Sequence, residues 1–424
     1  MTLILFLFSV ALVFHAKLWG FFDFGNPIVF MLDYHLFFLS LGVFVYYFNI
    51  YPAYHIENLT LILVLLSYVI TVFSAAVTYL VLGSAVRLRF SSTSYQRFTF
   101  RLDARANRFA DILWAVGVLL TVVVAVRSGF SALLSLAADG GFEDERVAAM
   151  SGNGIFVIPA QLFLLIGAAW SSIRQDRHFL IKVFVFFVSA ACMISFGFRS
   201  GIAFLVVICG IAKLYTKFGK IPVLKSAILA VVVLSCFVLL GVLRKGGGDV
   251  FERFAASFFW RSFVTVWNLD VILTQYKDFL SGGGILMELA VIVPGPDVNL
   301  GAHLKEALGY DFPGGGITPS YVGAGFVDFG MLGAVLYPAI TGCLVAFFYI
   351  VWPLLVGRGG LSFILLLIFS VTTSGVAAAG FVSPYLYFGV PLLILGVVGR
   401  FMISSRLRFQ ACGIKQSLEK PNYT

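Results

Sequence analysis

The sequence predicts an all-α polytopic membrane protein with about eleven transmembrane helices. The chain has 424 residues, a mean hydropathy of +1.00 and only 12% charged residues, which lie in narrow clusters between long apolar runs. The run 59–83 contains no charged residue and is long enough to cross ~30 Å of hydrocarbon as a helix. The runs are apolar on all sides, whereas the strands of a membrane barrel alternate every second residue. Helices, which satisfy their own backbone hydrogen bonds, are therefore the expected spanning elements.

Apolar runs account for most of the chain and predict a single membrane domain over residues 1–424. The first run lacks the basic start and the small-residue cleavage site of a signal peptide, so we count it as a helix. The expected number of spans is about 11, within a range of about 10–12. The runs cover residues 2–20, 28–49, 59–83, 110–126, 154–173, 179–196, 200–216, 226–243, 322–352, 361–380 and 384–403.

Basic residues mark the cytoplasmic face. The segment 87–108 holds six arginines against a single aspartate, and basic residues also gather at 174–177, at 213–225 and in the C-terminal tail. Cytoplasmic loops of membrane proteins collect lysine and arginine, so these segments are predicted to be cytoplasmic. The same bias explains the net charge of +9 without any binding of nucleic acid.

The opposite, outer face is predicted to carry the one large extramembrane segment, 244–321. Alternation from the cytoplasmic loops also places the N-terminus and the loops 127–153 and 197–199 on this face. The large segment mixes acidic and basic residues and contains three triple glycines, which break helices and let backbone approach a ligand closely. Between the glycines, 251–272 and 284–293 are predicted to form short helices.

Arg199 is the first candidate for binding an anion. It lies in Phe196-Gly197-Phe198-Arg199-Ser200-Gly201, the tight turn between two short apolar runs. A cation at membrane depth needs an anionic partner, because an unpaired one costs at least ~2.5 kcal/mol. A guanidinium matches a phosphate in bidentate geometry, which favours a role in binding a substrate phosphate. The alternative is that Arg199 pairs with lipid phosphate or with a carboxylate of the outer loop.

Arg244, Arg253 and Arg261 form a second set of candidate cations. Arg253 and Arg261 are eight residues apart, so they share a face if 251–265 is helical. Their segment is rich in phenylalanine and also holds a tryptophan, a pattern typical of an interfacial helix with aromatic anchors. The alternatives are therefore binding of lipid headgroups and binding of a lipid-linked pyrophosphate.

Acidic and imidazole side chains of the outer segment are candidates for a general base, because such groups accept a proton from an attacking hydroxyl. The alternative for each is a solvated loop charge. Asp33 and His35, near the start of the second run, are read as structural or interfacial, with a proton relay as the alternative. Glu288 belongs to the same acidic set as the candidates. The candidate catalytic residues are Asp297, His303, Asp311 and Asp328.

A helix start is predicted after the last triple glycine. Thr318 is expected to be the N-cap, with Pro319 at the first helical position and Ser320 following. A helix N-terminus offers free amides and a positive dipole end to an anion, so Thr318 and Ser320 are candidate binding residues. The alternative is a simple capped re-entry into the membrane.

These motifs, in this order, resemble the oligosaccharide repeat unit polymerases, the Wzy-type O-antigen and capsule polymerases of bacteria. The order is many apolar spans, the Gly-x-Arg-Ser-Gly turn, a large outer loop, and Gly-Ile-Thr-Pro-Ser before Asp328 and Phe-Gly-x-x-Gly. The residues that carry the resemblance are mainly 196–201 and 282–333. It implies a GT-C-like membrane glycosyltransferase of the bacterial inner membrane. Such an enzyme transfers a growing glycan from undecaprenyl pyrophosphate onto a new lipid-linked repeat unit at the periplasmic face.

The resemblance also implies a reaction without metal or cofactor. The chain contains no Asp-x-Asp motif and no histidine cluster, and arginine can neutralise a leaving pyrophosphate. Its five cysteines lack the paired spacing of a disulfide framework or a zinc site. The implied partners are lipid-linked oligosaccharides as donor and acceptor, the membrane itself, and a chain-length regulator protein.

Two other functions are consistent with this layout. An O-antigen ligase shares the general architecture and the donor but uses lipid A core as acceptor, and it is expected to carry a crucial histidine in the large loop. His303 is the one histidine of 244–321. A flippase or transporter would favour paired repeats, broken helices at midplane and charges deep in several spans. The concentration of charge in one outer loop favours an enzyme.

Overall fold

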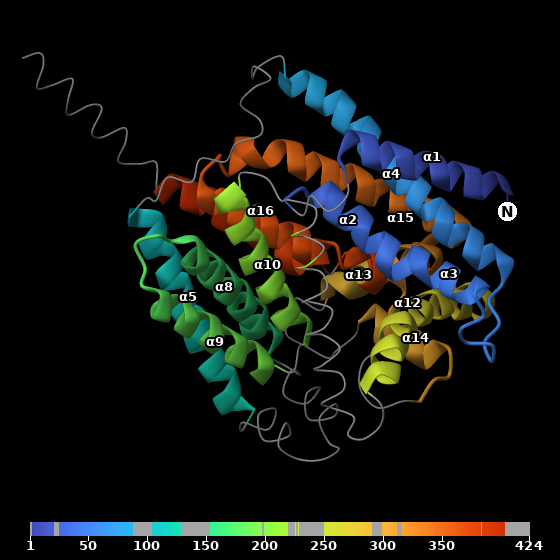
Figure 1. Ribbon diagram of the computed structural model, residues 1–424. Coiled ribbons are helices and arrows are strands. Elements are labelled where there is room, and N and C mark those ends of the chain that lie inside the picture. The colour runs from blue at the N-terminus through green and yellow to red at the C-terminus, as the bar shows by residue number, and fades with distance from the viewer. Residues whose placement is uncertain are drawn as a thin grey trace, which may run out of the picture.

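The computed structural model describes residues 2–20, 25–87, 104–128, 153–196, 199–218, 225, 228, 250–290, 299–311, 316–382 and 384–402. Within these residues the chain forms helices and no β-strand (Figure 1). The all-α class that the hydropathy pattern predicts is therefore confirmed.

Ten of the eleven predicted spans have a counterpart among the described helices, and the eleventh, 226–243, lies outside the described residues except for residue 228. Two of the ten, α1 (Thr2–Leu18) and α9 (Phe179–Ser195), are shorter apolar helices. The other eight are long and apolar enough to cross a membrane, so the protein is a multi-pass membrane protein. Within the described part of the chain, the eight segments that are long and apolar enough to cross a membrane are Pro27–Tyr47, Asn58–Ser84, Ala104–Arg127, Gly154–Ile173, Gly201–Phe218, Ser320–Leu355, Gly360–Ala378 and Tyr385–Met402.

One hydrophobic core joins the N-terminal helices to the helices that follow residue 250 (Figure 1). At its centre α4 packs along α15, and the close approach depends on Gly342, whose missing side chain leaves room for the Ser74 hydroxyl and the Thr71 backbone. Tyr68 and Tyr321 are fully buried in this core. Its helices are α1, α2 (Pro27–His35), the π-helical η1 (Leu36–Ser40), α3 (Leu41–Tyr47), α4 (Asn58–Arg87), α12 (Val250–Gln275), α13 (Gly283–Ala290), α14 (Leu300–Ala307), α15 (Ser320–Leu355) and α17 (Val376–Ala379).

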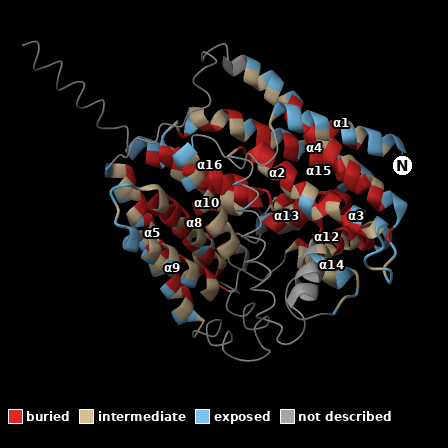
Figure 2. Ribbon diagram, in the orientation of Figure 1, coloured by how far each residue is buried: buried red, intermediate tan, exposed pale blue. Residues whose placement is uncertain are grey.

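A second core holds α5 (Ala104–Arg127), α8 (Gly154–Ile173), α9 and α10 (Arg199–Phe218). Gly167 lets α8 approach the Trp114 ring of α5, and the Trp170 indole donates to Asn107 at 2.9 Å. The helix α16 (Gly360–Thr373) contacts α2, α8 and α10, and it is buried along its whole length (Figure 2). It therefore connects the two cores.

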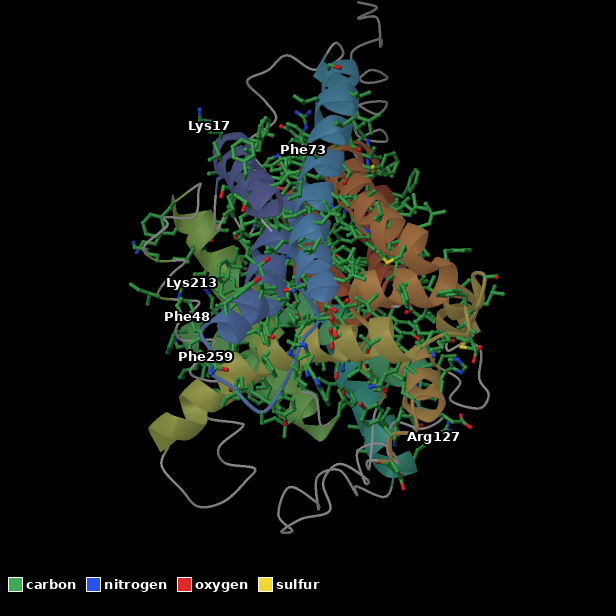
Figure 3. All side chains as sticks on the ribbon, turned by 90° about the vertical axis from the view of Figure 1, so that its right-hand side faces the viewer. Lys17, Phe48, Phe73, Arg127, Lys213 and Phe259 are labelled. Carbon is green, nitrogen blue, oxygen red and sulfur yellow. The ribbon has the colours of Figure 1, made fainter. Side chains whose placement is uncertain are left out.

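The helix α12 lies crosswise over one end of the first core (Figure 3). Its Asp270 accepts hydrogen bonds from the Glu57 amide at 2.9 Å and from the Thr60 hydroxyl at 2.5 Å, so it caps the start of α4. Its Ser262 hydroxyl donates to the Phe37 carbonyl at 2.7 Å, inside the π-helical turn η1. The predicted short helices of the large segment are confirmed as α12 and α13.

The helix α15 is sharply bent, whereas the sequence predicted one continuous run over 322–352. Phe329 and Gly330 leave helical geometry, and Gly330 adopts a φ of +63° that favours glycine. The bend folds the two arms together so tightly that a Cβ on Gly325 or Gly333 would overlap the carbonyl of the other. In a straight helix these two glycines would lie about 12 Å apart along the axis.

Candidate functional site

Side chains from α12 and the residue after it, from α14, and from the first arm of α15 and the segment before it lie at the end of the molecule that α12 covers. We call the set Asn268, Tyr276, His303, Thr318 and Asp328 the α12–α15 site. It contains two separate contacts: the Asn268 amide donates to the Thr318 hydroxyl at 3.5 Å, and the Tyr276 hydroxyl lies 3.2 Å from Nε2 of His303. The Leu280 amide, four residues after Tyr276, donates to the Val327 carbonyl at 2.9 Å, which brings the chain after Tyr276 to the neighbour of Asp328.

His303 is presented by the short helix α14. Asn299 caps this helix by accepting from the Ala302 amide at 2.8 Å. The Ile317 amide then donates to the Gly301 carbonyl at 3.0 Å, which fastens α14 against the chain that leads into α15. His303 is half-buried, so its imidazole has a fixed partner in Tyr276 and a side open to a substrate.

The Tyr276 phenol stays protonated at neutral pH. Its ring is 5% exposed, and burial raises the pKa of Tyr276, as do the negative charges of Asp278 and Asp328. Tyr276 is therefore a hydrogen-bonding partner that can orient His303.

Asp328 is enclosed at the bend of α15. One carboxylate oxygen accepts from the Gly284 amide at 2.7 Å, at the start of α13, and the other accepts from the Tyr337 hydroxyl at 2.6 Å. The Ser281 amide also donates to the Asp328 carbonyl at 2.9 Å. With 1% exposure and both oxygens engaged, Asp328 holds α13 and the two arms of α15 in place.

Glu288 makes a second clamp on α13. Its carboxylate accepts from the Val382 amide at 2.6 Å, just after the break that follows α17. Gly380, with a φ of +145°, approaches so closely that a Cβ there would lie 2.8 Å from the Glu288 carboxylate. The Phe381 ring lies 4.4 Å from the Tyr337 ring. α13 is thus tied to two helix breaks by two buried carboxylates.

The helix start at α15 differs from the prediction. α15 begins at Ser320, so Thr318 is not the N-cap and Pro319 precedes the helix. Ser320 has a φ of +55° and its hydroxyl accepts from the Gly323 amide at 3.3 Å, which is the bond that a capping serine makes. Ser320 is fully buried. Its hydroxyl is therefore occupied within the helix, while Thr318, half-buried beside Asn268, stays at the α12–α15 site.

The candidate cations are described to different extents. Arg261 is exposed on α12. It stands seven residues before Asn268, so the two lie on one stripe of the helix, about 10 Å apart along its axis. Arg253 lies in α12 and Arg199 begins α10, but their side chains fall outside the described part of the structure. Arg244 lies outside the described residues.

Within the described part of the chain, no hydrogen bond or ion pair joins Asp311 to the site. Asp311 is exposed, four residues after the end of α14. Asp297 lies outside the described residues. Across the described ranges, no group of three or more histidine, cysteine, aspartate or glutamate side chains is arranged to hold a metal ion.

Asp33 and His35 belong to a buried polar network inside the first core. His35 lies 2.9 Å from the Ser67 hydroxyl and 3.2 Å from the Ser40 hydroxyl, so both ring nitrogens have partners. Asp33 lies 3.8 Å from His15. These contacts fit the structural interpretation, with α1, α2 and α4 joined by hydrogen bonds where water is excluded.

Sequence reasoning missed Tyr337, Tyr276 and Asn268. Tyr337 follows Asp328 by nine residues, which in a straight helix puts the two on opposite faces. The bend at Gly330 brings them into contact, and the two glycines at 330 and 333 were the available signal. Tyr276 and Asn268 carry no motif, because their roles come from the crosswise packing of α12.

Comparison with known proteins identifies a family for this chain. A family model described as "Putative O-antigen polymerase" matches residues 23–377, a range that contains the whole α12–α15 site. The chain matches none of the curated proteins and none of the solved structures with which it was compared.

Proposed function

Because the chain belongs to the O-antigen polymerase family, we propose that it joins undecaprenyl-pyrophosphate-linked oligosaccharide repeat units into a glycan at the periplasmic face of the bacterial inner membrane. The family match over 23–377 carries this proposal. The α12–α15 site supports it, because the half-buried imidazole of His303 and the hydroxyl of Thr318 contact Tyr276 and Asn268, and the exposed guanidinium of Arg261 lies on α12.

The reaction transfers the growing glycan from donor to acceptor. A hydroxyl of the lipid-linked acceptor attacks the anomeric carbon of the donor, a new C–O bond forms, and the bond to undecaprenyl pyrophosphate breaks. His303 accepts the hydroxyl proton, and Tyr276 orients the imidazole. Asp297 and Asp311 are the alternative bases, and Asp328 acts as a positioning residue.

The leaving pyrophosphate requires positive charge. We assign this role to Thr318 of the α12–α15 site and to Arg261, about 10 Å along α12 from Asn268, with Arg199, Arg244 and Arg253 as further ligands. Ser320 is a poorer candidate because its hydroxyl is buried against Gly323. In this proposal no divalent ion takes part. A separate chain-length regulator protein acts on the enzyme.

Deletion of the gene in its host tests the pathway step. Loss of a polymerase leaves a single repeat unit on the lipopolysaccharide or the capsule carrier. Loss of a ligase leaves none on the lipid A core, and loss of a flippase accumulates lipid-linked repeat units inside the cell. We expect the single-unit pattern on a gel, restored by the wild-type chain.

Complementation with site variants tests the assignment of residues. Arg261→Lys keeps the charge but loses the planar fork, so chain elongation should fall strongly at normal protein level. Exposed Lys277 lies on the short segment after α12 and is the matched control, since Lys277→Ala should leave elongation unchanged. Full-length glycan made by Arg261→Ala at normal abundance would remove Arg261 from the mechanism.

A further inference from the structure

A pocket of about 390 Å³ opens between the end of α3 and the start of α4, away from any residue assigned above. Its lining comes from the connecting stretch 46–55. Three tyrosines at positions 46, 47 and 54 line it together with Asn49, His55 and two small residues, Pro52 and Ala53. Its volume is within the range of roughly 300–1,000 Å³ that is usual for small-molecule sites.

The lining selects a neutral, hydroxyl-rich ligand. It contains no lysine, arginine, aspartate or glutamate, so it offers nothing to neutralise a phosphate or an ammonium group. It also contains no leucine, isoleucine or valine to cover an acyl chain. Each tyrosine instead presents an apolar ring face beside a hydroxyl, and Asn49 presents both a donor and an acceptor. These are the groups that a sugar ring, with its C–H faces and hydroxyl edges, can satisfy.

The pocket is held in shape by α12. The Tyr54 ring lies 5.7 Å from Trp260, 5.5 Å from Phe263 and 5.5 Å from Trp267, between ring centroids. At the other end of the loop Asn49 adopts a φ of +52°, a left-handed conformation that asparagine tolerates. The backbone amide of Asn49 donates to the Tyr46 carbonyl at 2.9 Å. A fixed pocket loses less entropy when it binds a ligand than a mobile loop does.

The same helix connects the pocket with the α12–α15 site. Trp267 contacts the pocket residue Tyr54 and is followed in α12 by Asn268 of the α12–α15 site, and Tyr276 comes directly after the end of α12 at Gln275. We propose that the pocket is a saccharide subsite, which holds a sugar residue of the lipid-linked glycan some units away from the reacting bond. This inference rests on the proposed function for the identity of the glycan.

The direct test is binding of the glycan without its lipid. The probe is the oligosaccharide released by mild acid from the host's lipid-linked repeat unit, and the protein is the full chain in nanodiscs. Tyr47 is half-exposed, so Tyr47→Ala should fold normally and weaken binding about five- to tenfold through loss of one ring face. Tyr47→Phe, which keeps the ring, should lose less than Tyr47→Ala.

Phe48 supplies the matched control. It is the neighbouring aromatic residue, 77% exposed and outside the pocket lining (Figure 3). Phe48→Ala should leave glycan binding unchanged. If Phe48→Ala and Tyr47→Ala weaken binding equally, the tyrosines are membrane anchors and the subsite is refuted. His55→Ala, with a side chain 80% exposed, is a second variant that should also weaken binding. Unchanged binding in both Tyr47→Ala and His55→Ala would likewise refute the subsite.

Elongation assays separate the subsite from the proposed function and identify which glycan it holds. An acceptor subsite predicts that Tyr47→Ala raises KM for the repeat unit with kcat kept, and a donor subsite predicts shorter products at an unchanged initial rate. Glycan binding that depends on Tyr47 in a protein without polymerase activity would refute the function and keep the subsite. Wild-type kinetics and product length in Tyr47→Ala would refute the subsite and keep the function.

Discussion

Asp328 and Asp311, two acidic residues near the site, differ in burial and in hydrogen bonding. Asp328 accepts one bond from a backbone amide and one from a phenol, and it is almost fully buried. Asp311 is exposed in the chain that follows α14. Burial at 1% exposure keeps a substrate hydroxyl away from Asp328, which favours a structural role for it, whereas Asp311 is accessible to a substrate.

The first prediction concerns Asp328 and its partner. Asp328→Asn removes a charge that two buried donors share, and Tyr337→Phe leaves one carboxylate oxygen without its donor. Each should lower the free energy of unfolding by about 1–3 kcal/mol, measured by denaturation of the protein in detergent. Asp311→Asn, at an exposed position, is the control and should unfold like the wild type. An Asp328→Asn protein that is as stable as the wild type but inactive would make Asp328 the base instead.

The second prediction concerns the histidine–tyrosine pair. His303→Gln should cause a large loss of kcat with little change in donor binding, because glutamine cannot take the proton. Tyr276→Phe should cause a smaller loss of kcat, since it frees the imidazole without removing it. The raised pKa of Tyr276 keeps its phenol protonated, so its ionisation should not reduce the wild-type rate below about pH 10. Near-normal kcat in His303→Gln would move the base to Asp297 or Asp311.

At the scale of elements, the decisive feature is the bend in α15. Hydropathy identified the run 322–352 as a span but could not show the bend, because Phe329 and Gly330 are as apolar as their neighbours. The backbones of the two arms approach closely at Gly325 and Gly333, where a Cβ would not fit, and this approach fixes the angle between the arms. That angle brings Tyr337 to Asp328. Local composition predicts which residues are helical, whereas the path of a helix depends on what packs against it.

The third prediction tests this bend. Gly333→Ala places a methyl group where the Gly325 carbonyl lies, so the arms must move apart and the Asp328–Tyr337 contact must weaken. We expect a loss of stability and of elongation together, measured by thermal unfolding and by product length. Gly83→Ala is the control, because a Cβ on that helical glycine of α4 meets nothing within 4 Å. A Gly333→Ala protein that matches the Gly83→Ala protein in both measurements would contradict the tight bend.

At the scale of the whole molecule, the order of apolar runs predicted the architecture well. Ten of the predicted spans correspond to described helices, because lipid requires each spanning segment to satisfy its own backbone. The crosswise position of α12 was not predictable in the same way. It depends on long-range bonds such as Asp270 to the start of α4, between residues more than two hundred positions apart.

The fourth prediction concerns the sidedness of the membrane. The basic loop 87–108 and the C-terminal tail should be cytoplasmic, while 244–321 should be periplasmic. Reporter fusions at Ser94 and at Gly283, the first residue of α13, should therefore give signals of opposite compartments. The same compartment signal at both positions would overturn the assignment, and with it the periplasmic location of the α12–α15 site.

The most direct test of the central claim is elongation by the purified protein. Full-length chain in proteoliposomes would receive lipid-linked repeat units and excess chelator, and products would be resolved by length on a gel. The account predicts a ladder of multimers from the wild type, and a ladder that is lost in His303→Gln. An absence of multimers from the wild type, or multimers that appear only after magnesium or manganese is restored, would contradict it.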